Sequence, residues 1–158
     1  MDEGTRVEPR WLSSEQERVW RAYFVGSSLL AYQLNRELQD ARDITLPDYE
    51  ILVRLSQSPD RRMRMSQLAG EVASSKSRVS HQINRMENAG LVRRMECPSD
   101  GRGVFAVLTD EGMDLLRSAA PTHVTGVRAH LIDLLDEEEQ AVLGKVFTRI
   151  ADHFGGEL

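Results

Sequence analysis

Residues 65–109 contain the pattern that most restricts how this chain can fold. Two short helical segments surround a tight turn, and two strand-like segments joined by a polar, glycine-containing loop follow them. In the second helical segment, Val79, Ile83 and Met86 recur at the i, i+4, i+7 spacing of a buried stripe. This order of elements predicts a winged helix-turn-helix, a shape whose second helix fits the DNA major groove while the loop reaches the backbone or the minor groove.

The opposite face of the second helical segment carries Arg78, His81, Gln82 and Arg85, again at helical spacing. Such a polar face is ordinarily a solvated helix surface, but the charge distribution favours another interpretation. Residues 54–102 contain ten Lys/Arg and five Asp/Glu, a net charge of +5, whereas the whole chain carries −5 and the remainder therefore −10. Positive charge gathered around one helix and one loop of an otherwise acidic protein indicates a DNA-binding face.

Three features of this segment occur together: the run LAGEVASSKSRVSHQINRMENAGLVRR, the loop signature Asp100-Gly101-Arg102, and the strand ending Val107-Leu108-Thr109. With them, the segment resembles the DNA-binding lobe of the MarR family of bacterial transcriptional regulators. Long helices before and after the lobe extend the resemblance over roughly residues 14–154. The resemblance implies dimerisation through the first helix and the last two. It also implies that small phenolic or otherwise aromatic effectors bind between the dimerisation helices and the lobe.

Side chains that cap helices predict where the helices begin. They stand at Ser14, Thr45, Ser66 and Thr109, and the last helix is expected to start near Asp136, where three glutamates favour its N-terminal end. Pro121 is expected to break or kink the helix that follows the wing, and the polar segment 56–64 should be a linker. Ala73 occupies a turn position that often holds glycine, which suggests a turn without a positive φ at that residue.

We therefore expect a mainly α fold with a small β-hairpin wing, in three parts. Residues 1–44 form an N-terminal arm and a long dimerisation helix, residues 45–109 the winged helix-turn-helix lobe, and residues 110–158 the C-terminal dimerisation helices. The last helix presents an apolar side formed by Leu143, Val146, Phe147, Ile150 and Phe154. Such stripes can close one monomeric core or a core shared by two subunits. Two recognition helices held a helical turn apart by a twofold axis read a palindrome, which favours a homodimer on a pseudo-palindromic operator.

The predicted DNA contacts divide by role. Major-groove contacts are assigned to Arg78, His81, Gln82 and Arg85. Arg102 is assigned to the minor groove, with Asp100 holding it in position rather than touching DNA. Phosphate contacts are assigned to Ser66, Ser75, Lys76, Ser77 and Ser80.

Aromatic residues before and after residue 44 admit two interpretations. Trp20, Tyr23, Phe24 and Tyr49 stand at positions typical of core packing, and the family resemblance also places them near an effector cleft, where Arg21 could neutralise an acidic effector. The sequence names no effector.

Other chemistry has little support. The four histidines and Cys97 show no metal-ligand spacing, and we find no catalytic motif, so we expect no metal, no cofactor and no enzyme. With no long apolar run and no signal-peptide core, a cytoplasmic protein without membrane contact is expected. We interpret the chain as a homodimeric repressor released by a small effector. The alternatives are an architectural DNA-binding protein without an operator, a protein–protein adaptor that uses the winged helix as scaffold, and a redox-responsive regulator based on Cys97.

Overall fold

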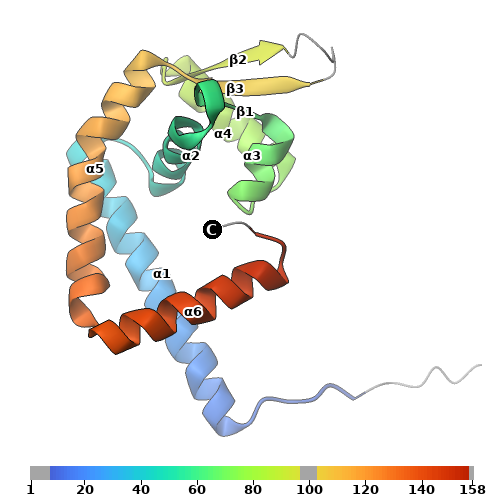
Figure 1. The fold of residues 1–158 in the computed structure, drawn as a ribbon, viewed down its shortest axis with the longest axis vertical. Coiled ribbons are helices and arrows are strands. Elements are labelled where there is room, and N and C mark those ends of the chain that lie inside the picture. The colour runs from blue at the N-terminus through green and yellow to red at the C-terminus, as the bar shows by residue number, and fades with distance from the viewer. Residues whose placement is uncertain (1–7, 97–102, 157–158) are drawn as a thin grey trace, which may run out of the picture.

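The computed structural model of this chain describes residues 8–96 and 103–156. Its elements, in chain order, are α1 (Ser14–Arg42), α2 (Leu46–Gln57), η1 (Pro59–Arg61), β1 (Arg62–Arg64), α3 (Met65–Glu71), α4 (Lys76–Asn88), β2 (Val92–Glu96), β3 (Val104–Leu108), α5 (Asp110–His130), η2 (Ile132–Leu134) and α6 (Glu137–His153). Figure 1 shows α2, α3, α4 and the sheet gathered at one end, with α1 and α5 running away from it. α6 starts at the far end of α5 and crosses α1, which continues beyond the crossing. The expected fold, mainly helical with a small β-sheet, is confirmed.

A three-stranded antiparallel sheet closes the lobe, with strand order β1-β3-β2. The hairpin pairs Val92 with Leu108, and β1 pairs Met63 with Ala106 on the other side of β3. The prediction of a simple linker over residues 56–64 is therefore wrong at both ends, since α2 continues to Gln57 and β1 begins at Arg62. Met63 is buried between two arginines that point the other way, and this alternation is the period of a strand.

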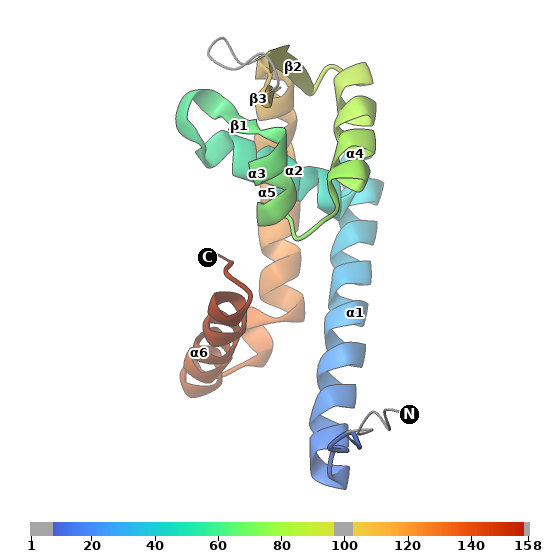
Figure 2. The ribbon, with the colours of Figure 1, turned by 90° about the vertical axis from the view of Figure 1, so that its right-hand side faces the viewer.

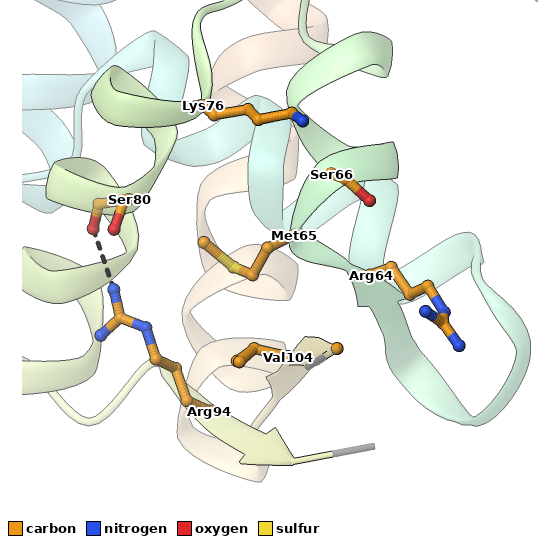
Figure 3. Close-up of a pocket in the computed structure, with 8 residues that line it drawn as sticks. Arg64, Met65, Ser66, Lys76, Ser80, Arg94 and Val104 are labelled. Carbon is orange, nitrogen blue, oxygen red and sulfur yellow. Dashed lines mark hydrogen bonds between the residues drawn. The ribbon is translucent and has the colours of Figure 1, made fainter. Parts of the chain in front are cut away.

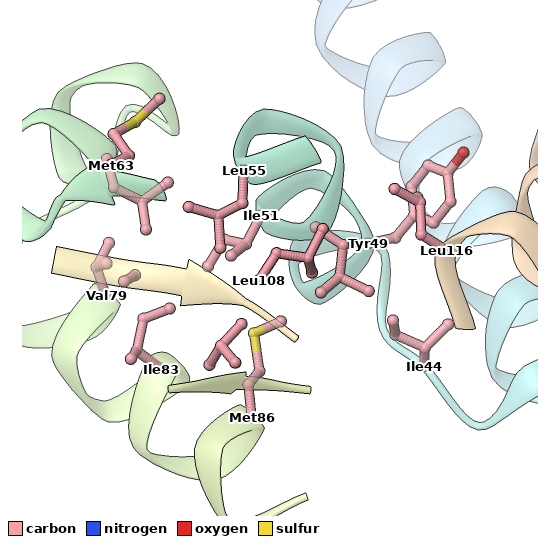
Figure 4. Packing of buried hydrophobic residues seen from close by; sticks show 14 of the residues in the cluster. Ile44, Tyr49, Ile51, Leu55, Met63, Val79, Ile83, Met86, Leu108 and Leu116 are labelled. Carbon is pink, nitrogen blue, oxygen red and sulfur yellow. The ribbon is translucent and has the colours of Figure 1, made fainter. Parts of the chain in front are cut away.

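The core of the lobe surrounds α2. Figure 4 shows side chains from α2, α4, β3 and α5 meeting in one cluster. Ile51, Leu52 and Leu55 of α2 are completely buried, as are Val79 and Ile83 of α4. The stripe predicted on the second helix of the motif thus packs inward, and it leaves the opposite face of α4 free to contact another molecule.

Three predicted helix starts are confirmed and two are displaced. Thr45, Thr109 and Asp136 cap α2, α5 and α6 with their side chains. The cap of α1 is Ser13 and not Ser14, because Ser13 and Gln16 form the reciprocal bonds of a capping box. α3 begins at Met65, directly after β1, and Ser66 lies inside its first turn. Its N-cap is Arg64, which makes no side-chain cap because it is the last residue of the strand.

The turn between α3 and α4 contradicts the expectation for Ala73. Ala73 has a φ of +47°, in the left-handed region. The N–H of Ala73 bonds to the carbonyl of Gly70 and that of Ser74 to the carbonyl of Ala69. This pair of bonds defines a Schellman motif, which requires a left-handed residue at this position whether or not it is glycine.

α5 begins in close contact with the hairpin. Thr109 caps the backbone N–H of Gly112 and donates its hydroxyl to the carbonyl of Gly90. A Cβ atom on Gly112 would lie 2.1 Å from the carbonyl oxygen of Leu91, so only glycine allows this approach. α5 then continues through Pro121 to His130. Pro121 therefore does not end the helix.

The far ends of α1 and α6 leave apolar side chains uncovered. Trp20 is 56% exposed, Phe24 58% and Phe154 80%, and Tyr23 and Ile150 are also exposed. Figure 2 shows α1 extending well beyond the lobe, and it shows α6 separated from the lobe. Core packing within one chain is therefore the wrong interpretation for Trp20, Tyr23 and Phe24. It is correct for Tyr49, which is buried. Among the described helices, none combines the length and the hydropathy needed to cross a membrane.

Candidate nucleic-acid interface

α4 presents its polar face outward from the lobe. Ser75 caps the helix by accepting a 3.2 Å hydrogen bond from the backbone N–H of Arg78. Because Val79, Ile83 and Met86 are turned into the core, the residues between them face solvent. The exposed side chains are Lys76, Ser77, Arg78, Ser80, His81, Asn84 and Arg85, and Gln82 is half-buried. Cations, hydroxyls and amides on one exposed helix can donate hydrogen bonds to phosphates and to base edges.

Two of the four predicted base-reading residues are held by a residue outside the helix. The buried Asp48 of α2 accepts hydrogen bonds from the Arg85 guanidinium at 2.6 and 2.9 Å and from the Gln82 amide at 2.9 Å. Arg78 and His81 are exposed. From the sequence, Asp48 was expected only to complete the helix-capping spacing that begins at Thr45, with no part in DNA recognition. The sequence feature that could have identified Asp48 is a carboxylate in the first turn of a predicted helix, followed directly by the apolar residues of that helix.

A basic hollow lies between α3, α4 and the sheet (Figure 3), with a volume of about 410 Å³. It brings together three predicted phosphate-contacting residues, Ser66, Lys76 and Ser80, although they come from two helices. Arg64 and Arg94 line it from the sheet. The ammonium group of Lys76 and the hydroxyls of Ser66 and Ser80 are the groups of this hollow that can hold a phosphate, since the Arg94 guanidinium is bonded to Glu87 and to the Ser80 carbonyl.

Arg94 ties β2 to the recognition helix. Its guanidinium donates to the Glu87 carboxylate at 2.6 Å, to the Asn84 side chain at 3.0 Å and to the Ser80 carbonyl at 3.0 Å. The Arg94 backbone N–H also donates to Glu87, and this bond, followed by the guanidinium, lowers the pKa of the Glu87 carboxyl. Arg94 had been counted only as one charge of the basic segment. The sequence feature that could have identified Arg94 is its position two residues after Val92 in a predicted strand, which places both side chains on the same side of the sheet.

The remaining predicted residues are distributed as follows. Ser75 and Ser77 are exposed at the start of α4. The predicted minor-groove residue Arg102, its partner Asp100, and Cys97 lie outside the described residues. In the described ranges 8–96 and 103–156, no three His, Cys, Asp or Glu side chains gather as metal ligands would.

The structure does not bring the five predicted effector residues into one place. The ring of Tyr23 packs at a tilt of 40° against Trp20, with 5.8 Å between ring centroids, and against Phe147 of α6, with 5.6 Å. Tyr49 instead packs on His123 of α5 at 4.6 Å. Burial raises the pKa of Tyr49 and lowers that of His123. Arg21 is exposed on another side of α1.

An apolar groove of about 720 Å³ runs between α1, the end of α5 and α6. Tyr23 and Leu30 line it from α1, and Leu143 and Phe147 from α6. Its polar contributors include Gln140, whose amide is already bonded to the carbonyls of Ile132 and Leu135. The groove therefore offers mainly apolar surface.

A basic helix exposed beside a hairpin, on a helix-turn-helix core, defines a winged-helix DNA-binding protein. The MarR family model matches residues 44–104. AbsC, a MarR family transcriptional regulator from Streptomyces coelicolor, is 50% identical, with a TM-score of 0.87 over 94% of this chain and 100% of AbsC. Sco3205, a MarR family regulator from the same organism solved in complex with DNA, is 43% identical, with a TM-score of 0.90 over 96% of this chain and 95% of Sco3205.

The curated transcriptional regulator HosA of Escherichia coli O111:H- is 34% identical over 98 residues, which cover 62% of this chain and 70% of HosA. This chain belongs to the MarR family. It is a DNA-binding transcriptional regulator and not an enzyme.

Proposed function

We propose that the protein is a homodimeric repressor that binds a pseudo-palindromic operator through α4 and is released by a small aromatic effector. The observation that carries the proposal is the exposed basic face of α4, together with the hollow in which Ser66 of α3 lies beside Lys76 and Ser80 of α4. Sco3205, which shares 43% of its residues with this chain, was solved in complex with DNA.

The dimer is supported by the uncovered apolar side chains of α1 and α6. Large apolar surfaces on a soluble monomer are uncommon, and such surfaces mark places where another molecule binds. A second copy of this chain would cover the exposed apolar side chains of both helices, Phe24 and Ile150 among them, which lie outside the groove between α1 and α6. A twofold axis there would give the pair of recognition helices that a palindrome requires.

In this proposal the DNA contacts keep the roles expected from the sequence. Arg78 and His81 read bases in the major groove together with Gln82 and Arg85, and Arg102 enters the minor groove. Three phosphate-contacting residues, Ser66, Lys76 and Ser80, share one hollow, which fits the backbone segment that passes between the two grooves. Ser75 and Ser77 contact the adjoining phosphates from the start of α4.

The effector part of the proposal rests on Trp20, Tyr23 and Phe24, which form one aromatic cluster at the edge of the groove. An aromatic ligand held there stacks on these rings and contacts the dimer interface. It releases DNA only if it prefers the conformer whose recognition helices are wrongly spaced, and DNA must then weaken its binding by the same factor. Titration of salicylate and related compounds, followed by tryptophan fluorescence and by operator release, tests this part.

The decisive experiment is selection of preferred sequences from a randomised duplex library, followed by gel shift over a range of salt concentrations and by sedimentation. A regulator of the proposed kind selects a palindrome, binds it as a dimer and loses affinity steeply as salt rises. Equal competition by random duplex would indicate an architectural protein instead, and an absence of salt-dependent binding would leave only a role in protein–protein contact.

A further inference from the structure

Asp48 occupies an unusual position for a charged residue in this lobe. It is a carboxylate in the first turn of α2, and its side chain is 9% exposed. Its backbone N–H is bonded to the hydroxyl of Thr45 at 3.2 Å, so the start of the helix is fixed. The positive N-terminal end of α2 favours a negative charge at this point.

The carboxylate faces the recognition helix. Both of its oxygens accept hydrogen bonds from one terminal nitrogen of Arg85, and the oxygen closer to that nitrogen also accepts from Gln82. Arg85 and Gln82 are 37 and 34 residues away in the chain, so these bonds join α2 to α4 across the lobe. A buried carboxylate is costly unless it is paired in this way, and an apolar side chain of similar size would serve packing alone at less cost.

These bonds leave the base-reading groups of both side chains available. The Gln82 amide gives one N–H to Asp48 and retains a second N–H and its carbonyl oxygen, the two groups that pair with adenine. Arg85 uses one terminal nitrogen, and its side chain remains 63% exposed. A guanidinium has five N–H donors, so enough remain for a bidentate contact with guanine.

We propose that Asp48 is a positioning residue for sequence reading, which holds Arg85 and Gln82 of α4 in the orientation in which they meet base edges. This inference rests on the proposed function, DNA recognition by α4. Long side chains lose rotamer freedom when they bind, and a side chain already held in place loses less. Asp48 therefore sharpens discrimination between bases without touching DNA itself.

The test compares Asp48→Asn with the wild type on duplexes that the wild-type protein selects from a randomised library. The asparagine keeps the shape and one acceptor oxygen but removes the charge that fixes Arg85. We expect preference at the base positions read by Arg85 and Gln82 to fall about 2- to 13-fold for each side chain, the range for ordering one long side chain on binding. Affinity for random duplex should stay the same or rise slightly, because a negative charge has been removed.

Glu71→Gln is the matched control. Glu71 is an exposed acid of α3 in the same lobe, and its bond goes to Gln67 on its own helix. Its removal changes the charge of the lobe equally and should leave base preference unchanged. The double variant Asp48→Asn, Arg85→Ala should show the same preference at the Arg85 position as Arg85→Ala alone, because Asp48 acts through Arg85.

Two results would overturn the inference. Unchanged base preference in Asp48→Asn is one. Tighter binding to every duplex with preference retained is the other, since it would mean that Asp48 withholds Arg85 from DNA. If the Asp48→Asn variant does not fold, a measurement on the wild-type protein still tests the proposal. NMR relaxation of the Arg85 side-chain Nε–H in the free protein should show the rigidity of the backbone. A mobile guanidinium refutes the proposal. Wild-type protein without any sequence preference would refute the proposed function itself.

Discussion

The DNA-binding lobe buries its apolar residues within one chain, whereas the two outer helices, α6 and the outer half of α1, leave theirs exposed. In the lobe, Ile51, Leu55 and Ile83 are completely buried by residues of the same chain. In α6, no residue of Glu137–His153 is buried, although the helix carries a continuous apolar side. Because burial of apolar surface is the main source of stability, the lobe is complete within one chain, whereas α6 and the outer half of α1 have apolar surface left for another molecule.

The largest expected effect comes from placing charge on the open side of α6. Val146→Glu combined with Ile150→Glu would have to bury two carboxylates in the proposed dimer interface, which is prohibitive without partners. We expect a monomer by sedimentation and a loss of operator affinity of at least about 100-fold, since a monomer reads only half of a palindrome.

The matched control uses the same two charges on the other side of the helix. Ala141 and Thr148 are exposed and lie about half a turn away from the apolar side. Ala141→Glu with Thr148→Glu should remain dimeric and bind normally. If both double variants dimerise, α6 is not part of the interface, and its exposed apolar side does not serve dimerisation.

A second prediction compares one isoleucine from each region. Ile83→Ala leaves a cavity in the closed core and should lower the free energy of unfolding by about 2–5 kcal/mol. Ile150 is 45% exposed, so Ile150→Ala should cost less than about 1 kcal/mol of protomer stability while weakening dimerisation. Urea unfolding at a protein concentration where the wild type is monomeric measures the stability of the single chain in both variants. Similar losses for both variants would contradict the contrast.

Within the lobe, the next effect separates sequence reading from charge. Arg78→Ala or His81→Ala should cost about 1–3 kcal/mol on the selected operator and flatten preference at one base position. Lys76→Ala should weaken binding to all duplexes and reduce the salt slope by about one. Footprinting titrations at several salt concentrations distinguish the two. Intact affinity and preference in Arg78→Ala would disprove the assignment of α4 as the reading helix.

The smallest expected effect concerns pH at the contact between α2 and α5. Burial lowers the pKa of His123 below its ordinary value of 6.5, and the nearby Glu50 carboxylate opposes this only in part. Below that value the unfolded chain takes up a proton that the folded protein does not, so the free energy of unfolding falls as pH decreases, by at most about 1.4 kcal/mol per pH unit.

His123→Phe keeps a ring against Tyr49 and removes the buried Nδ1, which has no hydrogen-bond partner among the residues that the structure describes. Between about pH 7.5 and 5.5 its stability should fall less than that of the wild type. Urea unfolding at several pH values measures this. If the free energy of unfolding changes equally with pH in the variant and the wild type, burial does not lower the pKa of His123.

Periodicity was enough to predict the elements that pack by themselves. The stripe of Val79, Ile83 and Met86 predicted which side of α4 is buried, and the caps at Thr45 and Asp136 fixed two helix starts. The strand β1 escaped prediction because three residues give only one alternation, and it exists because β3 offers it an edge. At Ala73, the hydrogen bonds that end α3 outweighed the local preference of alanine.

The site was predictable only in part, for a similar reason. Exposed donors at helical spacing on α4 can be seen in the sequence, since their placement depends on one helix. The contact of Asp48 with Arg85 and the clasp of Arg94 on Glu87 depend on how separate elements pack, and nothing within either segment specifies them. Likewise, Tyr49 was grouped with the aromatics of α1 by residue type, whereas the packing of α2 against α5 places it elsewhere.

The close contact at Gly112 has a mechanical consequence. α5 begins two residues after β3 and cannot slide along the hairpin, because the backbone of Leu91 presses against its first turn. The helix has 21 residues and is therefore about 30 Å long. If α5 tilted as a rigid rod about its contact at Gly112, a rotation of about 6° would move its His130 end, which lines the apolar groove, by about 3 Å. The groove and the hairpin would then have to move together, because one continuous helix joins them.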